Sequence, residues 1–295
     1  MIPYFLALAA AQAPSLPSSP DPMPPPRPAP AAQAPAPNVG PATAPPADPA
    51  VETRYRACID QVRADAGAAV AAANSWREEG GGIHARICLG LALAALERWP
   101  EAATAFEQAA REAERGQDPR RADFWVQSGN AWIAAGEPPR ALQAFDAALQ
   151  TPDLTPELRG EVHLDRARAM AAQNEVAGAR AEIDRALALV AADPFAWYLS
   201  AALARRENNL SRAGIDIARA RSLAPDNPDI LLLAGTLAGQ AGNMEEAERL
   251  YRQVAGGAPD SDAGRAARES LATMREVEVD APAGAPPAPA PATPQ

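Results

Sequence analysis

Apolar and small residues recur along the middle of the chain at helical spacing. Five alanines, separated by 39, 38, 34 and 34 residues, mark the period: Ala102, Ala141, Ala179, Ala213 and Ala247. A larger apolar residue follows each of them after four positions, and a glycine or alanine precedes each by twelve. Such spacing is typical of amphipathic α-helices, and its repetition indicates a repeat architecture. We therefore predict repeated helical hairpins, each with a short polar turn such as the one around Gly136.

The period divides residues 83–259 into five units, which we place at 83–116, 122–155, 160–193, 194–227 and 228–261. The first two units are longer, and their extra residues lie at 115–119 and 151–156, where we expect lengthened loops. Flanking segments complete the predicted stack, with a helical hairpin at 52–80 and a capping helix at 262–279. Repeat arrays need such terminal elements because each unit buries its apolar face only against its neighbours.

Both ends of the chain differ in composition from the middle. Residues 1–13 are a short apolar run that ends in Ala11-Gln12-Ala13, a pattern typical of a cleaved signal peptide, although no basic residue precedes the run. Residues 14–51 and 280–295 are rich in proline and alanine, and we expect them to be a disordered linker and tail. The chain is then periplasmic or secreted, or cytoplasmic if the apolar run is not a signal. We expect no membrane span in the mature chain.

The repeated unit resembles the tetratricopeptide repeat, a family whose unit is a pair of antiparallel helices. The unit at 122–155 carries the resemblance best, through Trp125, Gly129, Trp132, Gly136, Ala141, Phe145 and Ala148. The third unit departs from the family pattern, because His163 stands where an aromatic or aliphatic residue is usual. The resemblance implies an all-α fold, a right-handed superhelical solenoid of helical hairpins.

The resemblance also implies a concave groove lined by the first helix of each unit. The groove positions of the family correspond here to Ile87, Asp123, Val126, Asn130, Leu164, Arg168, Phe195, Tyr198 and Arg205. In such a groove Arg168 and Arg205 are candidates to hold a carboxylate of a partner. We therefore expect a protein or peptide partner, and leave the oligomeric state open.

Composition excludes several classes of chemistry. All 27 basic residues are arginine, so P-loops and lysine Schiff-base enzymes are excluded. The net charge of −10 disfavours nucleic acid as a partner. Two histidines and two cysteines leave no recognisable catalytic, cofactor or metal set, although His84, Cys88 and Cys58 would supply three zinc ligands.

The two cysteines allow one internal bridge, because Cys58 lies in the flanking hairpin and Cys88 in the adjacent first unit. An exported protein favours a disulfide between them, and two buried thiols are the alternative. The sequence as a whole favours a non-enzymatic scaffold of the cell envelope. A cytoplasmic scaffold, a helical-repeat RNA binder and an enzyme of unrecognised class are the alternatives.

Overall fold

The computed structural model describes residues 48–152 and 154–280. The predicted signal peptide, and the linker and tail apart from their inner ends, lie outside these residues. The described part of the chain forms thirteen α-helices and no strand, which confirms the all-α prediction. The helices are α1 (Pro49–Ala64), α2 (Ala66–Glu78), α3 (Gly82–Ala95), α4 (Trp99–Arg115), α5 (Arg121–Ala134), α6 (Pro138–Leu149), α7 (Pro156–Ala172), α8 (Val176–Leu189), α9 (Pro194–Arg206), α10 (Leu210–Leu223), α11 (Pro228–Gln240), α12 (Met244–Gly257) and α13 (Asp262–Asp280).

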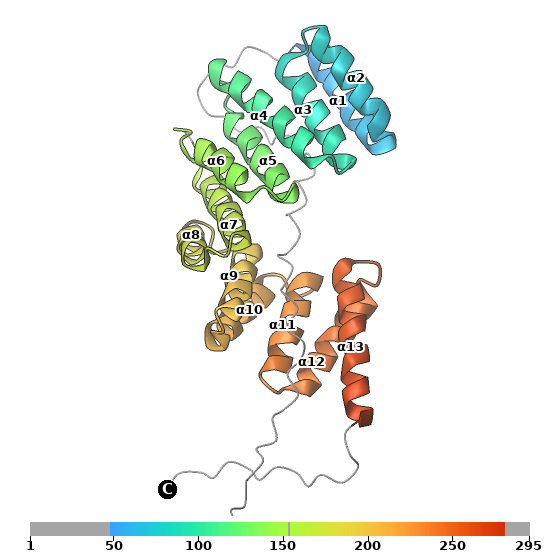
Figure 1. Cartoon of the computed structure of the whole chain (residues 1–295), viewed down its shortest axis with the longest axis vertical. Coiled ribbons are helices and arrows are strands. Elements are labelled where there is room, and N and C mark those ends of the chain that lie inside the picture. The colour runs from blue at the N-terminus through green and yellow to red at the C-terminus, as the bar shows by residue number, and fades with distance from the viewer. Residues whose placement is uncertain (1–47, 153, 281–295) are drawn as a thin grey trace, which may run out of the picture.

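Each helix packs on the next one along the chain, and the hairpins stack into a curved solenoid (Figure 1). The five predicted units contain the pairs α3–α4, α5–α6, α7–α8, α9–α10 and α11–α12, while α1, α2 and α13 flank them. Buried apolar residues form four separate clusters along the stack rather than one central core. Stability is therefore distributed along the array, as expected for a solenoid.

The same turn ends the first helix of all five units. One residue in each turn has a positive φ between 57° and 81°, and these residues are Glu97, Gly136, Asn174, Asn208 and Gly242. The next residue donates its backbone N–H to the carbonyl four positions before the turn residue, at 2.8–2.9 Å in every unit. This is the Schellman cap, in which glycine and asparagine accept the left-handed conformation most easily. Each turn residue lies five positions before a marker alanine, so the five units are structurally equivalent.

The marker alanines hold the two helices of each hairpin together. All five are buried, with exposed fractions of 0–1%. In each unit, the small residue twelve positions before the marker alanine packs against the large residue four positions after it. Where the small residue is smaller, the large residue is larger. Glycine opposes an aromatic ring in three units, at Gly90 and Phe106, Gly129 and Phe145, and Gly235 and Tyr251. In the other two units alanine occupies the glycine position and isoleucine replaces the ring, at Ala167 and Ile183, and at Ala201 and Ile217.

Candidate functional site

The odd-numbered helices form one side of the solenoid. They contact one another directly from unit to unit, at α5–α7, α7–α9 and α9–α11, and the flanking α1 and α13 continue this arrangement. Figure 1 shows α7 inside the bend of the stack and α8 outside it. We call the side of the odd-numbered helices the inner face and the side of the even-numbered helices the outer face. The inner face is where a curved solenoid offers a continuous surface to a partner.

Five of the nine predicted groove residues remain at least partly exposed on odd-numbered helices. Asp123 is exposed, while Asn130, Phe195, Tyr198 and Arg205 are half-buried. The rings of Phe195 and Tyr198 are stacked, with centroids 6.1 Å apart and an interplanar angle of 28°. Two large, stiff rings on one helix are typical anchors for a partner chain, because aromatic side chains bury much area with little loss of rotamer freedom.

The other four predicted groove residues lie in the interior, which corrects the prediction for them. The side chains of Ile87, Val126, Leu164 and Arg168 have exposed fractions of 8, 8, 1 and 2%. Ile87 and Val126 belong to the apolar cluster that α3 to α7 form, and Leu164 belongs to the cluster of α7 to α9, so the packing of consecutive helices covers these positions. These residues hold neighbouring units together and are not available to a partner.

Arg168 is paired with side chains of the protein itself. Its Nη1 donates to Oδ1 of Asp165 at 3.0 Å and to Oδ1 of Asn130 at 3.4 Å. Asn130 in turn donates from Nδ2 to Oδ2 of Asp165 at 3.0 Å, which joins α5 to α7. A buried guanidinium is tolerated only when it is paired in this way. The three side chains therefore tie the second unit to the third.

An aromatic group closes the N-terminal end of the inner face, and sequence reasoning did not identify it. The ring of His84 on α3 stacks with Trp76 at a centroid distance of 6.5 Å and meets Tyr55 of α1 edge-on at 5.5 Å. The guanidinium of Arg54 lies over Trp76, 5.0 Å from the ring centroid. Burial, assisted by the positive charge of Arg120, lowers the pKa of His84 and so favours the neutral imidazole.

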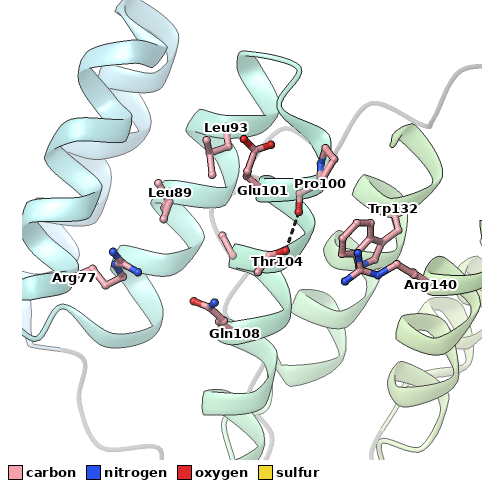
Figure 2. Close-up of a pocket in the computed structure, with 10 residues that line it drawn as sticks. Arg77, Leu89, Leu93, Pro100, Glu101, Thr104, Gln108, Trp132 and Arg140 are labelled. Carbon is pink, nitrogen blue, oxygen red and sulfur yellow. Dashed lines mark hydrogen bonds between the residues drawn. The ribbon is translucent and has the colours of Figure 1, made fainter. Parts of the chain in front are cut away.

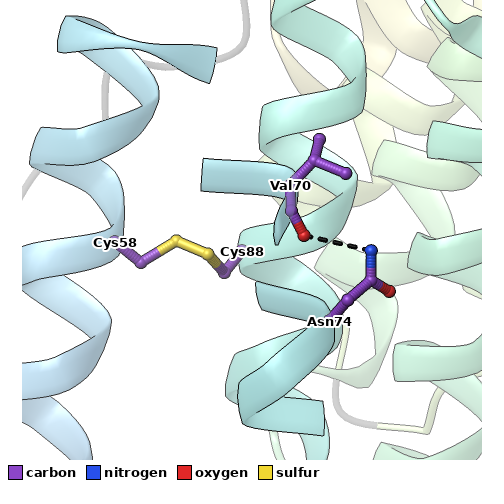
Figure 3. The surroundings of a disulfide bond; sticks show 4 residues. All are labelled: Cys58, Val70, Asn74 and Cys88. Atoms are coloured by element: carbon purple, nitrogen blue, oxygen red, sulfur yellow. Dashed lines mark hydrogen bonds between the residues drawn. A yellow bond between two sulfur atoms is a disulfide. The ribbon is translucent and has the colours of Figure 1, made fainter. Parts of the chain in front are cut away.

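The predicted bridge between Cys58 and Cys88 is confirmed. It joins α1 to α3, with the two Cα atoms 6.1 Å apart (Figure 3). Both sulfur atoms are used in the bond, so neither cysteine is left as a nucleophile or as a zinc ligand beside His84. Nearby on α2, Nδ2 of Asn74 donates to the carbonyl oxygen of Val70 at 3.0 Å. The bridge fixes the flanking hairpin to the first unit.

The unusual His163 of the third unit belongs to a buried ionic group. Its Nδ1 lies 2.6 Å from Oε2 of Glu182 on α8, whose side chain is 4% exposed. The guanidinium groups of Arg166 and Arg185 also contact Glu182, and Arg166 reaches Asp146 of α6. Burial raises the pKa of Glu182, but the hydrogen bond from His163 and the two arginine charges outweigh it, and the pKa falls below its usual value.

The depressed pKa of Glu182 predicts a pH dependence of stability. Since the folded carboxyl has a lower pKa than the unfolded one, its stabilisation is complete above the unfolded pKa of about 4.3 and is lost as the pH falls from there through the lower pKa of the folded state. We expect Glu182→Gln to lower the free energy of unfolding by about 1 kcal/mol at pH 7 and by clearly less at pH 4. Urea unfolding of both proteins at the two pH values measures this difference. An equal loss at both values would contradict the assignment.

Within residues 48–152 and 154–280, no three histidine, cysteine or acidic side chains are grouped so as to hold a metal ion. In the same part of the chain, no helix has the length and apolar character needed to span a membrane.

Comparisons with known proteins agree with the repeat pattern. The family model of the tetratricopeptide repeat matches residues 89–157. No curated protein matches this chain.

Three solved structures are similar in fold. PilW, described as a widely conserved type IV pilus biogenesis factor, is 21% identical, covers 74% of this chain and 98% of its own, and has a TM-score of 0.60. PilF of Pseudomonas aeruginosa is 17% identical, with coverages of 75% and 97% and a TM-score of 0.57. A thermophilic tetratricopeptide-repeat protein of Thermus thermophilus is 17% identical, with coverages of 66% and 100% and a TM-score of 0.53. Together with the five equivalent hairpins, these findings show that the chain contains tetratricopeptide repeats and has the fold of a solenoid built from them.

Proposed function

We propose that this protein is a non-enzymatic scaffold of the cell envelope that binds other proteins through its inner face. The observation that carries the proposal is the stacked, half-buried pair of Phe195 and Tyr198 on α9. The rings lie on one of the helices that line the bend, and Arg205 is on the same helix. An extended peptide or a helix of a partner would place an apolar side chain against the rings and a carboxylate near Arg205.

Two observations support the envelope as the location. The disulfide between Cys58 and Cys88 is a bond that persists in oxidising compartments and is rare in the cytosol. The apolar run at 1–13 has the pattern of a signal peptide. The likeness to PilW concerns the fold, and it suggests pilus assembly as the first context in which to look for partners.

Binding to the inner face can be tested with a substitution on α9. A substitution on α10, on the outer side of the same unit, is the control. We expect Tyr198→Ala to weaken the binding of at least one partner about tenfold or more, which corresponds to about 1.4 kcal/mol. Ile215→Ala changes a residue of α10 on the outer face that is 68% exposed, and it should leave binding unchanged. The measurement is quantitative affinity capture from envelope extracts, followed by titration of the purified partner.

Arg205→Ala serves as the second test variant, because it removes the charge on the same helix while the ring pair is kept. All three variants are first compared with the wild type by circular dichroism and thermal unfolding, so that loss of folding is separated from loss of binding. If every captured partner binds Tyr198→Ala and Arg205→Ala as strongly as the wild type, the inner face is not the binding surface.

A further inference from the structure

A pocket lies on the opposite side of the stack, on the outer face of the first two units. Its volume is about 320 Å³, at the lower end of the range for binding pockets. We call it the outer pocket. Most of its residues belong to the even-numbered helices, and α3 and α5 supply the rest (Figure 2). Its lining consists of Arg77, Leu89, Leu93, Pro100, Glu101, Thr104, Ala105, Gln108, Trp132 and Arg140.

The floor of the outer pocket is apolar and its rim is polar. Leu93, Ala105 and Trp132 are buried beneath it, with exposed fractions of 5, 4 and 2%. The exposed residues of the rim include Thr104 and Gln108, which lie on the outer side of α4. The hydroxyl of Thr104 donates to the carbonyl oxygen of Pro100 at 2.8 Å. A pocket of this composition accepts a large apolar side chain and directs polar groups toward its edge.

Two arginines flank the pocket, and their charges are not neutralised locally. Arg77 of α2 and Arg140 of α6 lie on opposite sides of α4 in Figure 2. Neither forms an ion pair with any carboxylate of the described residues, whereas elsewhere in the stack pairs such as Arg86 and Glu112, at 2.6 Å, are common. The one carboxylate in the lining, Glu101, is already held by Arg98 at 2.9 Å. In a chain of net charge −10, the pocket is a local positive site.

Arg140 is also held in place. Its guanidinium carbon lies 3.4 Å from the ring centroid of Trp132, so the planar group stacks on the indole. A stacked guanidinium keeps its N–H groups at the edge available, and these match the geometry of a carboxylate. The turn around Gly136 places the two residues together, because Trp132 lies in the last turn of α5 and Arg140 in the first turn of α6.

We propose that the outer pocket binds an acidic segment of a second protein. A large apolar side chain of that segment would lie on Leu93 and Trp132, and carboxylates on either side of it would pair with Arg77 and Arg140. The apolar floor favours a peptide over a free anion, and the two separated charges favour carboxylates on both sides of the apolar residue. The protein would then hold one partner on its inner face and another on its outer face at the same time.

The test uses the full chain and a displayed library of short random peptides as the probe. Peptides are selected on the wild type in the presence of an excess of the soluble double variant Arg77→Gln and Arg140→Gln, which removes sequences that bind elsewhere. The matched control is Arg219→Gln with Arg268→Gln, two exposed arginines far from the pocket in sequence that also lack a carboxylate partner among the described residues. The control changes the net charge by the same amount.

The proposal predicts enriched peptides with acidic residues on both sides of a large apolar residue. Their affinity, measured by fluorescence anisotropy, should fall at least tenfold in the pocket variant, and at least tenfold when their acidic residues become amides. Binding to the control variant and to Tyr198→Ala should stay within twofold of the wild type. The proposal is overturned if no peptide is enriched over the competitor, if the enriched peptides lack acidic residues, or if they bind the pocket variant as well as the wild type.

Discussion

Replacing Gly129 with alanine is expected to lower the free energy of unfolding by about 1–3 kcal/mol. In an open helix the same change is favourable by about 1 kcal/mol, because glycine is a poor helix former. Here the added Cβ would lie 2.7 Å from Cδ1 and Cζ of Phe145, which is closer than carbon atoms approach. The helices α5 and α6 would have to separate, and the contact that defines the hairpin would be lost.

The third and fourth units indicate which second substitution should compensate for Gly129→Ala. The third and fourth units pair alanine with isoleucine where the second pairs glycine with phenylalanine. We therefore expect the double variant Gly129→Ala with Phe145→Ile to be more stable than the sum of the two single changes indicates, by about 1 kcal/mol or more. Urea unfolding of the four proteins gives this coupling free energy.

Gly214 provides the control for helix propensity. It lies within α10, and a Cβ added there would meet nothing within 4 Å. Gly214→Ala should stabilise the protein by about 0.5–1 kcal/mol. If Gly129→Ala stabilises to the same extent, close packing of glycine on the aromatic ring is not what sets the hairpin geometry.

Removing the disulfide is expected to destabilise the N-terminal end of the stack by about 2–4 kcal/mol. The bridge closes a loop with a sequence separation of 30 and joins α1 to α3, so its loss frees the flanking hairpin from the first unit. Because stability in a solenoid is distributed, the effect should be local. Hydrogen exchange should rise in α1 and α2 of the Cys58→Ala and Cys88→Ala double variant, while α11 and α12 keep their protection.

Chemical reduction of the disulfide in the wild-type protein gives an independent comparison. We expect the same pattern of hydrogen exchange as in the double variant. The buried apolar group around Trp76 and Ala73 remains in both cases, so the hairpin should loosen without the whole chain unfolding. Unchanged exchange in α1 and α2 after either treatment would show that apolar packing alone fixes the flanking hairpin, and that the bridge contributes little.

The sequence was sufficient to predict the repeat because its signals are local. The marker alanines and the turn residues recur at the same separations, and the structure confirms their equivalence through the five Schellman caps. The sequence favoured the disulfide over two buried thiols, since Cys58 and Cys88 lie in elements expected to neighbour each other and the chain carries a signal-like run, and the structure contains the bond.

The contacts between units were harder to predict, because they depend on how closely successive hairpins approach. Arg168 was expected to face a partner, yet the contact between α5 and α7 buries it against Asp165 and Asn130. His163, which departs from the family pattern, pairs with Glu182 of the next helix, and no local pattern shows that pairing. The outer pocket was missed for the same reason, since Arg77 and Arg140 are distant in sequence.

The central claim is that partners bind the inner face, and site-specific photo-crosslinking in the native host tests it most directly. A benzoylphenylalanine replaces Phe195 on α9 in one strain and Ile215 on the outer side of the same unit in another. We predict crosslinked adducts with other proteins from position 195 and none of these adducts from position 215. Adducts from position 215 alone, or no adduct from position 195 in a protein that is folded and present at normal levels, would contradict the account.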